Sequence, residues 1–485
     1  MDHDCDTRPG HCATLRVAAL SVSLALLASG CAFFVPDKIH HVVNPAEQPA
    51  ARCDLDDNAE PAERILGIAL SGGGSRAAVF GAAALEALSE HGVLEQLSHL
   101  SSVSGGSLAA SYFMANPPGC EETATTQAEQ ACWHEYFSDF KTQMRVNYQY
   151  GIVTHNARPT RFTSPTRRVT SLQEELDKRF LHGKTFGELG PHPVVLINAT
   201  SYDETRRFVF SNACLAEGAA ESSAASGQDG GKRYRIMAEN ALAQRALQAF
   251  TFSRPHCMRP VPNDLPVSLA VAASASFPPA IGPVSIEVPS DCDAGEPEWW
   301  HLGDGGAIEN SGVDSLEEVL LRRLADPGPP LQKALILSVD AGKKMDPAEL
   351  KARKNFRMNS SPSRANLVVI SPRVRGQAYH DVFWDEMIAE LASEGIGFEK
   401  ITFKHGLAQL ARLPDSCSGK MSVEEVISDL LSEIPTRFTV DDCNADLLEM
   451  AAHQLVHESL DDATVQRLTG EGFAIHASRG CRLRQ

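Results

Sequence analysis

A serine follows an apolar run in a small-x-Ser-x-Gly turn, the pattern of a nucleophile. Ser104 lies in the segment SVSGG (residues 102–106), between a strand-like run over residues 97–103 and a helical segment over residues 107–115. Such a turn strains the serine backbone and exposes its hydroxyl, and it needs small neighbours because strand and helix nearly collide. The N-terminus of the following helix favours an anionic intermediate. These residues alone leave a plain Ser/Gly turn open.

A glycine-rich turn stands upstream of the serine. Gly72, Gly73 and Gly74 follow a short apolar run over residues 64–70 and precede an Ala- and Leu-rich helical pattern over residues 77–90. Successive backbone N–H groups in such a turn bind anions, and in an acyl hydrolase they would form the oxyanion hole. A phosphate-binding loop is the competing interpretation. It is weakened because the segment has neither a Gly-Lys-Ser/Thr ending nor a G-x-G-x-x-G pattern.

An aspartate flanked by glycines provides a third group with possible chemistry. Asp304 stands in GDGG (residues 303–306), after a short run that contains two tryptophans. A carboxylate in such a tight loop can be aimed at a partner, although an ordinary turn aspartate is the alternative. The histidines downstream of this aspartate lie in no recognised loop motif, and we expect them to be surface or core residues. They are His380, His405, His453, His457 and His476. His301, three residues before Asp304, would need a different geometry to act as a base.

The order of these three motifs resembles the patatin-like phospholipase family. The motifs are SGGGSRAA (residues 71–78), SSVSGGS (residues 101–107) and GDGGAIENSG (residues 303–312). Two further stretches are similar to the family, and the whole resemblance covers about residues 63–342. They are VVLINATSYD (residues 194–203) and AVAASASFPPAIGPV (residues 270–284).

The resemblance implies a Ser-Asp dyad. Ser104 would attack an ester carbonyl, and Asp304 would accept its proton and return one to the leaving group. The glycines of the upstream turn, Gly72 to Gly74, would hold the oxyanion. Arg76 occupies the family's basic position and would serve a phosphate headgroup or the fold of the loop. Ser102 and Ala77 replace glycines that are common in the family, and neither change removes a catalytic group.

The elements that must position these residues are strands, each followed by a turn and a helix. Two such units in succession indicate a parallel sheet with crossover helices. The fold class is therefore predicted as a three-layer α/β/α sandwich with a mainly parallel central sheet and loop insertions. We expect the catalytic domain over residues 63–342. We expect a C-terminal extension over residues 343–485, with a basic segment followed by helices.

The N-terminus is typical of an exported lipoprotein. Residues 1–30 contain an apolar segment too short for a confident membrane span and typical of a signal peptide. They end in Ala28-Ser29-Gly30-Cys31, which resembles a lipobox in which Cys31 is lipidated; an ordinary cleaved signal is the alternative. Ala32 after the cysteine favours the outer membrane, with the membrane face left open. Residues 31–62 are predicted to be a tether.

Net charge bears on which partners the protein can bind, and the cysteines bear on whether it forms disulfides. A net charge of -18 makes the chain a poor general binder of nucleic acid. In an exported chain, cysteines in loop-like segments suggest disulfides, and Cys120–Cys132 and Cys417–Cys443 are plausible local pairs. No C-x-x-C or His/Cys cluster has metal spacing, so we expect no metal and no cofactor.

Two softer features concern contact with lipid. Four aromatic residues share one helical face, and core packing is favoured over a membrane-contacting cap. They are Trp133, Tyr136, Phe137 and Phe140. Residues 343–375 are basic, and a solvated loop is favoured over contact with anionic headgroups.

The predicted function is hydrolysis of an acyl ester, with membrane lipids as substrate and an acyl-Ser104 intermediate. Two alternatives stay open. One is an esterase or thioesterase on small soluble esters, and the other is a non-catalytic, lipid-binding lipoprotein of the envelope. Intact Ser104 and Asp304 argue against the second, since a binding role does not need both. Protein partners cannot be inferred from the sequence.

Overall fold

The structure is a computed structural model in which most of the chain is described. The described residues are 36–41, 63–120, 126–162, 164–213, 252, 258, 261–277, 281–289, 296–325, 331–342, 362–393, 395–417, 431 and 434–477. No helix among them is long and apolar enough to cross a membrane. Cys31 and the predicted signal peptide lie outside the described residues.

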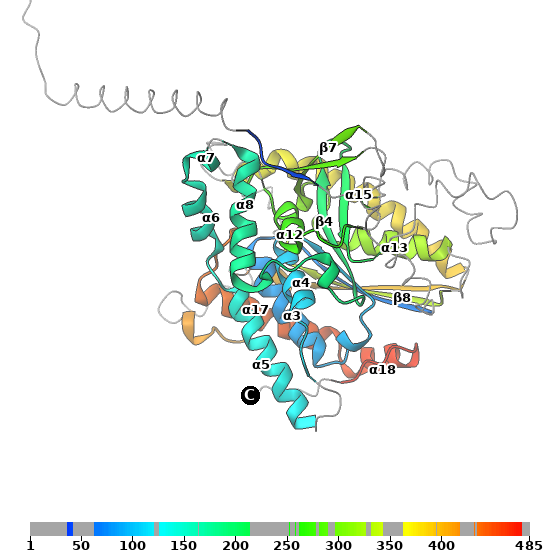
Figure 1. Cartoon of the computed structure of the whole chain (residues 1–485). Coiled ribbons are helices and arrows are strands. Elements are labelled where there is room, and N and C mark those ends of the chain that lie inside the picture. The colour runs from blue at the N-terminus through cyan, green and yellow to red at the C-terminus, as the bar shows by residue number, and fades with distance from the viewer. Residues whose placement is uncertain are drawn as a thin grey trace, which may run out of the picture.

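A central sheet of nine strands organises the molecule (Figure 1). Its order is β1-β6-β7-β4-β3-β2-β8-β9, and β5 pairs with β4 beside this path. The strands are β1 (Ile39–His41), β2 (Arg64–Leu70), β3 (His99–Val103), β4 (Val194–Ser201), β5 (Arg206–Ser211), β6 (Val284–Pro289), β7 (Pro297–Asp304), β8 (Lys333–Asp340) and β9 (Gly397–Lys404). The run from β4 through β9 is parallel, whereas β5 and β7 pair with β4 in antiparallel fashion.

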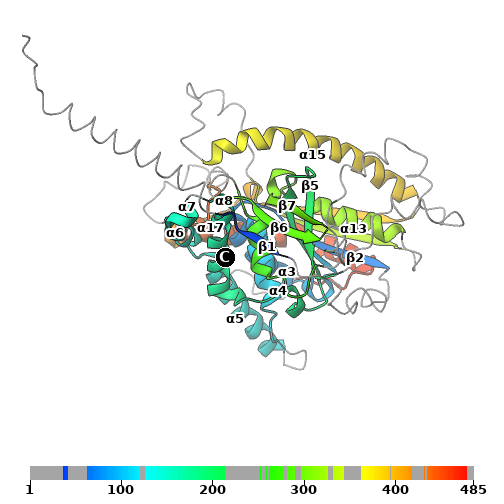
Figure 2. The ribbon, with the colours of Figure 1, turned by 45° about the horizontal axis from the view of Figure 1, so that its top comes forward.

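Helices cover both faces of this sheet (Figure 2). The larger ones are α3 (Ser75–Ser89), α4 (Gly105–Ala115), α5 (Thr126–Met144), α6 (Tyr148–Asn156), α8 (Pro165–Leu176), α12 (Val267–Ser274), α13 (Val313–Ala325), α15 (Pro362–Ser393), α17 (Asp442–Ser459) and α18 (Asp462–Gly470). Shorter helical turns are α7 (Pro159–Phe162), Leu94–Gln96, Asp177–Leu181, Phe186–Glu188, Gly305–Ala307, His405–Leu407 and Asp415–Cys417.

Strand β2 shows how the sequence builds the layers. Ile68 and Leu70 pack into the core shared with α3, α4 and α17, while Ala69 packs with Leu316 of α13. Ile65 belongs to a separate hydrophobic cluster that contains Trp384 of α15. Neighbouring side chains of a strand point to opposite faces, so a strand buried on both faces is apolar throughout. The predicted three-layer sandwich with a mainly parallel sheet is confirmed.

The domain division differs from the predicted one at both ends. Residues 39–41, within the predicted tether, form β1 and pair in parallel with β6. Strand β9 lies beyond residue 342 and pairs with β8 along its whole length. Apolar residues of α17, such as Leu448 and Ala452, belong to the same core as α3. The C-terminal part of the chain therefore completes the sandwich instead of extending from it.

Two predictions about packing and cross-links are confirmed. Disulfides join Cys120 to Cys132 and Cys417 to Cys443. Phe140 of α5 is buried, and its ring stacks on Tyr112 of α4 with ring centroids 4.4 Å apart. The aromatic face of α5 therefore belongs to the core. The other cysteines predicted to be available for disulfides lie outside the described residues: Cys53, Cys214, Cys257, Cys292 and Cys481.

Candidate active site

Ser104 connects β3 to α4 in a strained backbone conformation. Its φ is 50° and its ψ is −116°, a combination that residues other than glycine rarely adopt. A side chain on the next residue would have no room, because a Cβ on Gly105 would lie 2.1 Å from the carbonyl oxygen of Gly74. A Cβ on Gly106 would lie 2.5 Å from the carbonyl oxygen of Leu70. The two glycines thus allow the sharp turn that presents the serine.

The hydroxyl of Ser104 meets the carboxylate of Asp304 directly. Ser104 Oγ donates a hydrogen bond of 2.9 Å to Asp304 Oδ2. Ser104 lies at the end of β3 and Asp304 at the end of β7, so the sheet brings together two residues from distant parts of the sequence. Both are buried, with 7% and 6% of their surface exposed. This is the contact that a nucleophile and its general base require.

The second oxygen of Asp304 is held by the backbone. Gly306 N donates a hydrogen bond of 2.7 Å to Asp304 Oδ1. Burial raises the pKa of Asp304 from 3.8 to about 6, while the bonds from Ser104 and Gly306 and the charge of Arg373 act in the opposite direction. A carboxylate of this basicity is a stronger proton acceptor than an exposed one and remains ionised at neutral pH.

Ser274, the last residue of α12, supports the nucleophile and was not singled out from the sequence. Its Oγ accepts a hydrogen bond of 2.8 Å from Ser104 N and donates one of 2.5 Å to the carbonyl oxygen of Asn198 on β4. Ser102, which replaces a common glycine, is also accommodated, because its Oγ accepts a bond of 3.1 Å from Ser107 Oγ. The only signal for Ser274 was its place in the Ala/Ser-rich stretch over residues 270–284.

The glycine-rich turn lies against the Ser104 turn, but its three glycines differ. Gly72 N donates a hydrogen bond of 2.8 Å to the carbonyl oxygen of Asn310, so this N–H group is already engaged. The geometry therefore favours Gly73 and Gly74 as the donors to an oxyanion. Gly74 has φ 62°, and a Cβ there would lie 2.2 Å from the carbonyl oxygen of Arg437. Glycine is required at this position for both reasons.

Arg76 lies inside the protein, in α3. Only 2% of its surface is exposed, and it donates hydrogen bonds of 2.8 Å to the carbonyl oxygen of Ala341 and 2.5 Å to that of Ile434. Burial lowers its pKa to about 10. Of the two roles expected for Arg76, this environment favours the fold of the loop, because a buried guanidinium bonded to two carbonyls does not reach a headgroup.

A different arginine approaches the dyad. Arg373 of α15 donates a hydrogen bond to the carbonyl oxygen of Gly306, two residues after Asp304. Its positive charge lowers the pKa of Asp304, and its own pKa is lowered by burial. No local pattern distinguishes Arg373 from the other basic residues of the segment 343–375. That segment was expected to be a solvated loop, but from residue 362 it is part of α15.

The histidines nearest to the motifs have other partners. His301 on β7 pairs with Asp203, with 3.0 Å between Nδ1 and Oδ1. The ring of His405 is buried, and its Nδ1 lies 3.3 Å from the carbonyl oxygen of Asp340. Neither contact places the histidine as a base on Ser104.

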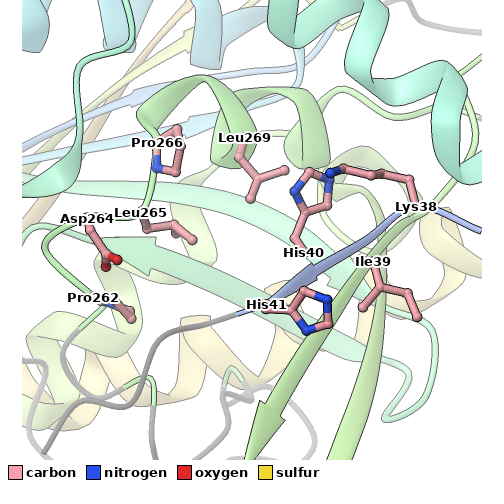
Figure 3. Close-up of a pocket in the computed structure, with 9 residues that line it drawn as sticks. All are labelled: Lys38, Ile39, His40, His41, Pro262, Asp264, Leu265, Pro266 and Leu269. Atoms are coloured by element: carbon pink, nitrogen blue, oxygen red, sulfur yellow. The ribbon is translucent and has the colours of Figure 1, made fainter.

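A separate cavity of about 230 Å³ opens between β1 and the beginning of α12 (Figure 3). Its lining residues are Lys38, Ile39, His40, His41, Pro262, Asp264, Leu265, Pro266 and Leu269. Burial lowers the pKa of His40 to about 4. None of these residues belongs to the predicted site, so the cavity is distinct from the dyad.

One family model matches more than half of the chain. The model described as "Patatin-like phospholipase" matches residues 68–317, which is more than half of the 485 residues. No protein of curated function matches the sequence significantly.

Solved structures give more distant matches. Human GIVD cytosolic phospholipase A2 in complex with the inhibitor methyl gamma-linolenyl fluorophosphonate and terbium chloride is 11% identical, with a TM-score of 0.39 over 84% of this chain and 59% of that chain. A second structure of the human enzyme is 13% identical, with a TM-score of 0.41, covering 84% and 60%. VipD from Legionella pneumophila is 11% identical, with a TM-score of 0.26, covering 82% and 67%. The chain spans about three fifths of the two human structures.

Proposed function

The chain belongs to the patatin-like phospholipase family, and on this basis we propose that it is a serine acyl hydrolase acting on phospholipids or other glycerolipids. The observation that carries the proposal is the 2.9 Å hydrogen bond from Ser104 Oγ to the buried carboxylate of Asp304. A binding protein has no need of a strained serine bonded to a base of raised pKa. The non-catalytic alternative is therefore disfavoured.

In the proposed reaction, Ser104 Oγ attacks the carbonyl carbon of the ester while its proton passes to Asp304 Oδ2. The negative charge that develops on the carbonyl oxygen is stabilised by the N–H groups of Gly73 and Gly74 and by the N-terminus of α4. Asp304 then gives the proton to the leaving alcohol as the ester bond breaks. Asp304 then takes a proton from a water molecule that attacks the carbonyl carbon of acyl-Ser104, and it returns this proton to Ser104 Oγ as the fatty acid leaves.

The positive charge beside the dyad supports a phospholipid as substrate. Arg373 contacts the loop that follows Asp304 and is only half-buried. We assign it the headgroup role that the sequence suggested for Arg76. A phosphodiester near the scissile ester would interact with this guanidinium.

The substrate class is tested by comparing phospholipid vesicles with short-chain soluble esters at equal ester concentration. The expected result is release of fatty acid from vesicles by the wild type, and none by Ser104→Ala. Hydrolysis of soluble esters alone, lost in Ser104→Ala, would establish the esterase or thioesterase instead. If the folded wild type hydrolyses neither substrate, the proposal that the protein is an acyl hydrolase is wrong.

The proposed setting of this reaction is the outer membrane, with the protein anchored through lipidated Cys31. The support is the sequence alone, namely the apolar segment that ends in Ala28-Ser29-Gly30-Cys31. Metabolic labelling with a fatty acid, in the wild type and in Cys31→Ala, tests it. We expect label in the wild type and none in Cys31→Ala. Equal labelling of the two proteins would contradict lipidation at Cys31.

A further inference from the structure

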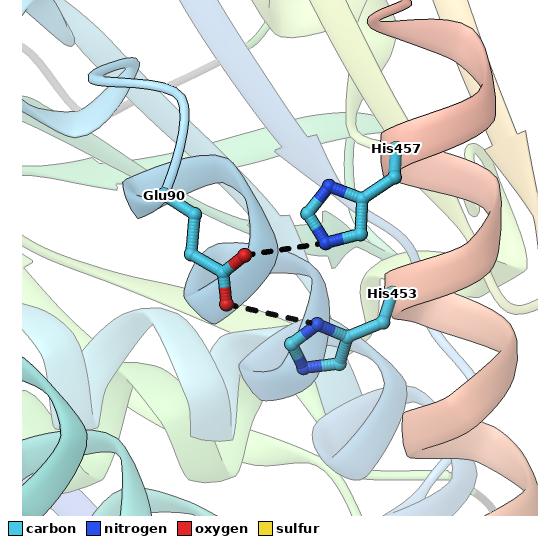
Figure 4. Close-up of side chains that lie close together, drawn as sticks. All are labelled: Glu90, His453 and His457. Atoms are coloured by element: carbon cyan, nitrogen blue, oxygen red, sulfur yellow. Dashed lines mark ion pairs between the residues drawn. The ribbon is translucent and has the colours of Figure 1, made fainter. Parts of the chain in front are cut away.

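Two histidines of α17 face a glutamate that caps the C-terminal end of α3 (Figure 4). His453 and His457 stand one helical turn apart, and both rings point toward the carboxylate of Glu90. His457 Nε2 lies 3.2 Å from Glu90 Oε2, and His453 Nδ1 lies 4.0 Å from Glu90 Oε1. The three potential ligand atoms lie within 4.8 Å of one another.

The hydrogen bonds of His457 determine which of its nitrogens carries the proton. His91 Nδ1 is 3.0 Å from the carbonyl oxygen of His476, which can only accept, so His91 donates there. His91 is buried, and in the neutral form of a ring that donates through Nδ1 the other nitrogen, Nε2, is an acceptor. That nitrogen lies 3.0 Å from His457 Nδ1, which must therefore donate. In neutral His457, the lone pair is then on Nε2, the atom that faces Glu90.

His453 is oriented in the same way by a second carboxylate. Its Nε2 lies 3.0 Å from Glu86 Oε2, which also accepts a bond of 2.6 Å from Lys141 Nζ. A carboxylate oxygen bonded to Lys141 is an acceptor, so Nε2 of His453 carries the proton. In neutral His453, the lone pair is on Nδ1, again the atom nearest to Glu90.

In the neutral form of both rings, two imidazole lone pairs and a carboxylate therefore converge on one point. Lone pairs that face a carboxylate repel it, whereas a cation among them would bind all three groups. Histidines that ligate metals commonly donate their other N–H group to a carboxylate or to another fixed acceptor, which sets the tautomer. Both rings have this arrangement.

We propose that Glu90, His453 and His457 form a binding site for Zn²⁺ or a similar divalent transition metal. Two imidazoles and one carboxylate are a common zinc donor set, with a fourth position left for water. Metal–ligand bonds of about 2.0–2.2 Å at tetrahedral angles separate ligand atoms by about 3.3–3.5 Å. The two separations between Glu90 and the histidines, 3.2 and 4.0 Å, bracket this range, and all three atoms lie within 4.8 Å of one another, so small side-chain movements complete the site.

The site is accessible, and it joins parts of the chain that are far apart in sequence. The side chains of Glu90, His453 and His457 are 29%, 24% and 30% exposed, so solvent and ions reach them. Glu90 ends the helix whose other end follows the glycine-rich turn, while the histidines belong to the C-terminal part of the chain. A bound metal would fasten α17 to α3 and stabilise the sandwich. The sequence did not reveal the site, because Glu90 lies far from the two histidines along the chain.

The test is titration of the chelator-treated, dialysed chain with Zn²⁺ by calorimetry, followed by Co²⁺ substitution. We expect one Zn²⁺ per chain at this site and a visible Co²⁺ spectrum of tetrahedral nitrogen and oxygen ligation without thiolate bands. The double variant H453Q/H457Q should lower the affinity at least a hundredfold, and E90Q at least tenfold. H134Q, at an exposed position on α5, is the matched control and should bind like the wild type.

Thermal unfolding gives a second readout that does not depend on activity. Zn²⁺ should raise the Tm of the wild type and of H134Q, and leave that of the double variant unchanged. Circular dichroism without metal shows whether each variant is folded. No Zn²⁺ binding by the folded wild type would overturn the proposal. Unchanged binding in the folded double variant would overturn it as well.

Discussion

Asp304 Oδ2 accepts a hydrogen bond of 2.9 Å from Ser104 Oγ, and the carboxylate that makes this contact has a pKa raised by burial to about 6. As the general base, Asp304 must be ionised, so protonation abolishes activity. We predict that kcat/KM falls as the pH falls through about 6. A pH–rate profile on a neutral substrate measures this limb. Full activity maintained down to pH 4 would contradict the role of Asp304.

The charge of Arg373 acts on the same ionisation. Because Arg373 lowers the pKa of Asp304, Arg373→Met should move the acidic limb of the profile to higher pH. It should also weaken activity on anionic phospholipids more than on neutral esters. Arg375→Met is the control, since Arg375 is an exposed residue of the same helix. If both variants have the same pH–rate profile, Arg373 does not influence the ionisation of Asp304.

The buried carboxylate should lower the stability of the protein. A folded-state pKa of about 6 against an ordinary value of 3.8 means that ionisation opposes folding. This destabilisation is absent below about pH 4, grows between the two pKa values, and is complete above about pH 6. Asp304→Asn should therefore raise the free energy of unfolding by about 1 to 3 kcal/mol at pH 7.5.

Denaturant unfolding of the wild type and Asp304→Asn at pH 7.5 and at pH 4 measures the effect. The difference between the two proteins should shrink toward zero at the lower pH. A variant that is less stable than the wild type at pH 7.5 would show that the hydrogen bonds of Asp304 outweigh its burial.

The close approach of the two turns makes Gly105 sensitive to substitution. A Cβ at this position would lie 2.1 Å from the carbonyl oxygen of Gly74, which is backbone and cannot rotate away. Gly105→Ala should displace the glycine-rich turn, with Gly73 and Gly74, from Ser104. We expect kcat to fall by roughly 100-fold, since misplacement by about 1 Å has that cost. Stability should fall by about 1–3 kcal/mol. Gly119→Ala is the control, because a Cβ there meets no atom within 4 Å.

The two residues that the structure brings into contact, Ser104 and Asp304, could be singled out from the sequence, whereas two of the residues around them, Ser274 and Arg373, could not. Ser104 and Asp304 stand in short motifs whose geometry is local, a strand end followed by a tight turn. Ser274 and Arg373 contribute through single contacts with residues remote in sequence, and no local pattern distinguishes them from other serines and arginines. The sequence alone does not decide between the two roles expected for Arg76, because its environment depends on contacts with Ala341 and Ile434, which are distant along the chain.

The fold shows the same division between local and distant information. The strands buried on both faces, such as β2 and β8, are continuous apolar runs and were recognisable. Strand β9 has the sequence GFEKITFK and is mostly half-exposed. Because it contains charged residues, it is not a continuous apolar run, and the sequence does not indicate that it forms an edge strand of the sheet. Strand β1 has only three residues, and nothing in so short a segment indicates that it pairs with β6.

The central claim is that Asp304 activates Ser104 as a nucleophile, and labelling with a fluorophosphonate probe tests it most directly. We predict one covalent adduct per chain, mapped by mass spectrometry to Ser104. The adduct should be absent in Ser104→Ala and form much more slowly in Asp304→Asn, with both variants folded by circular dichroism. The reaction should be repeated with lipid micelles. A folded wild type that stays unlabelled with and without micelles, or an adduct on another residue, would contradict the account.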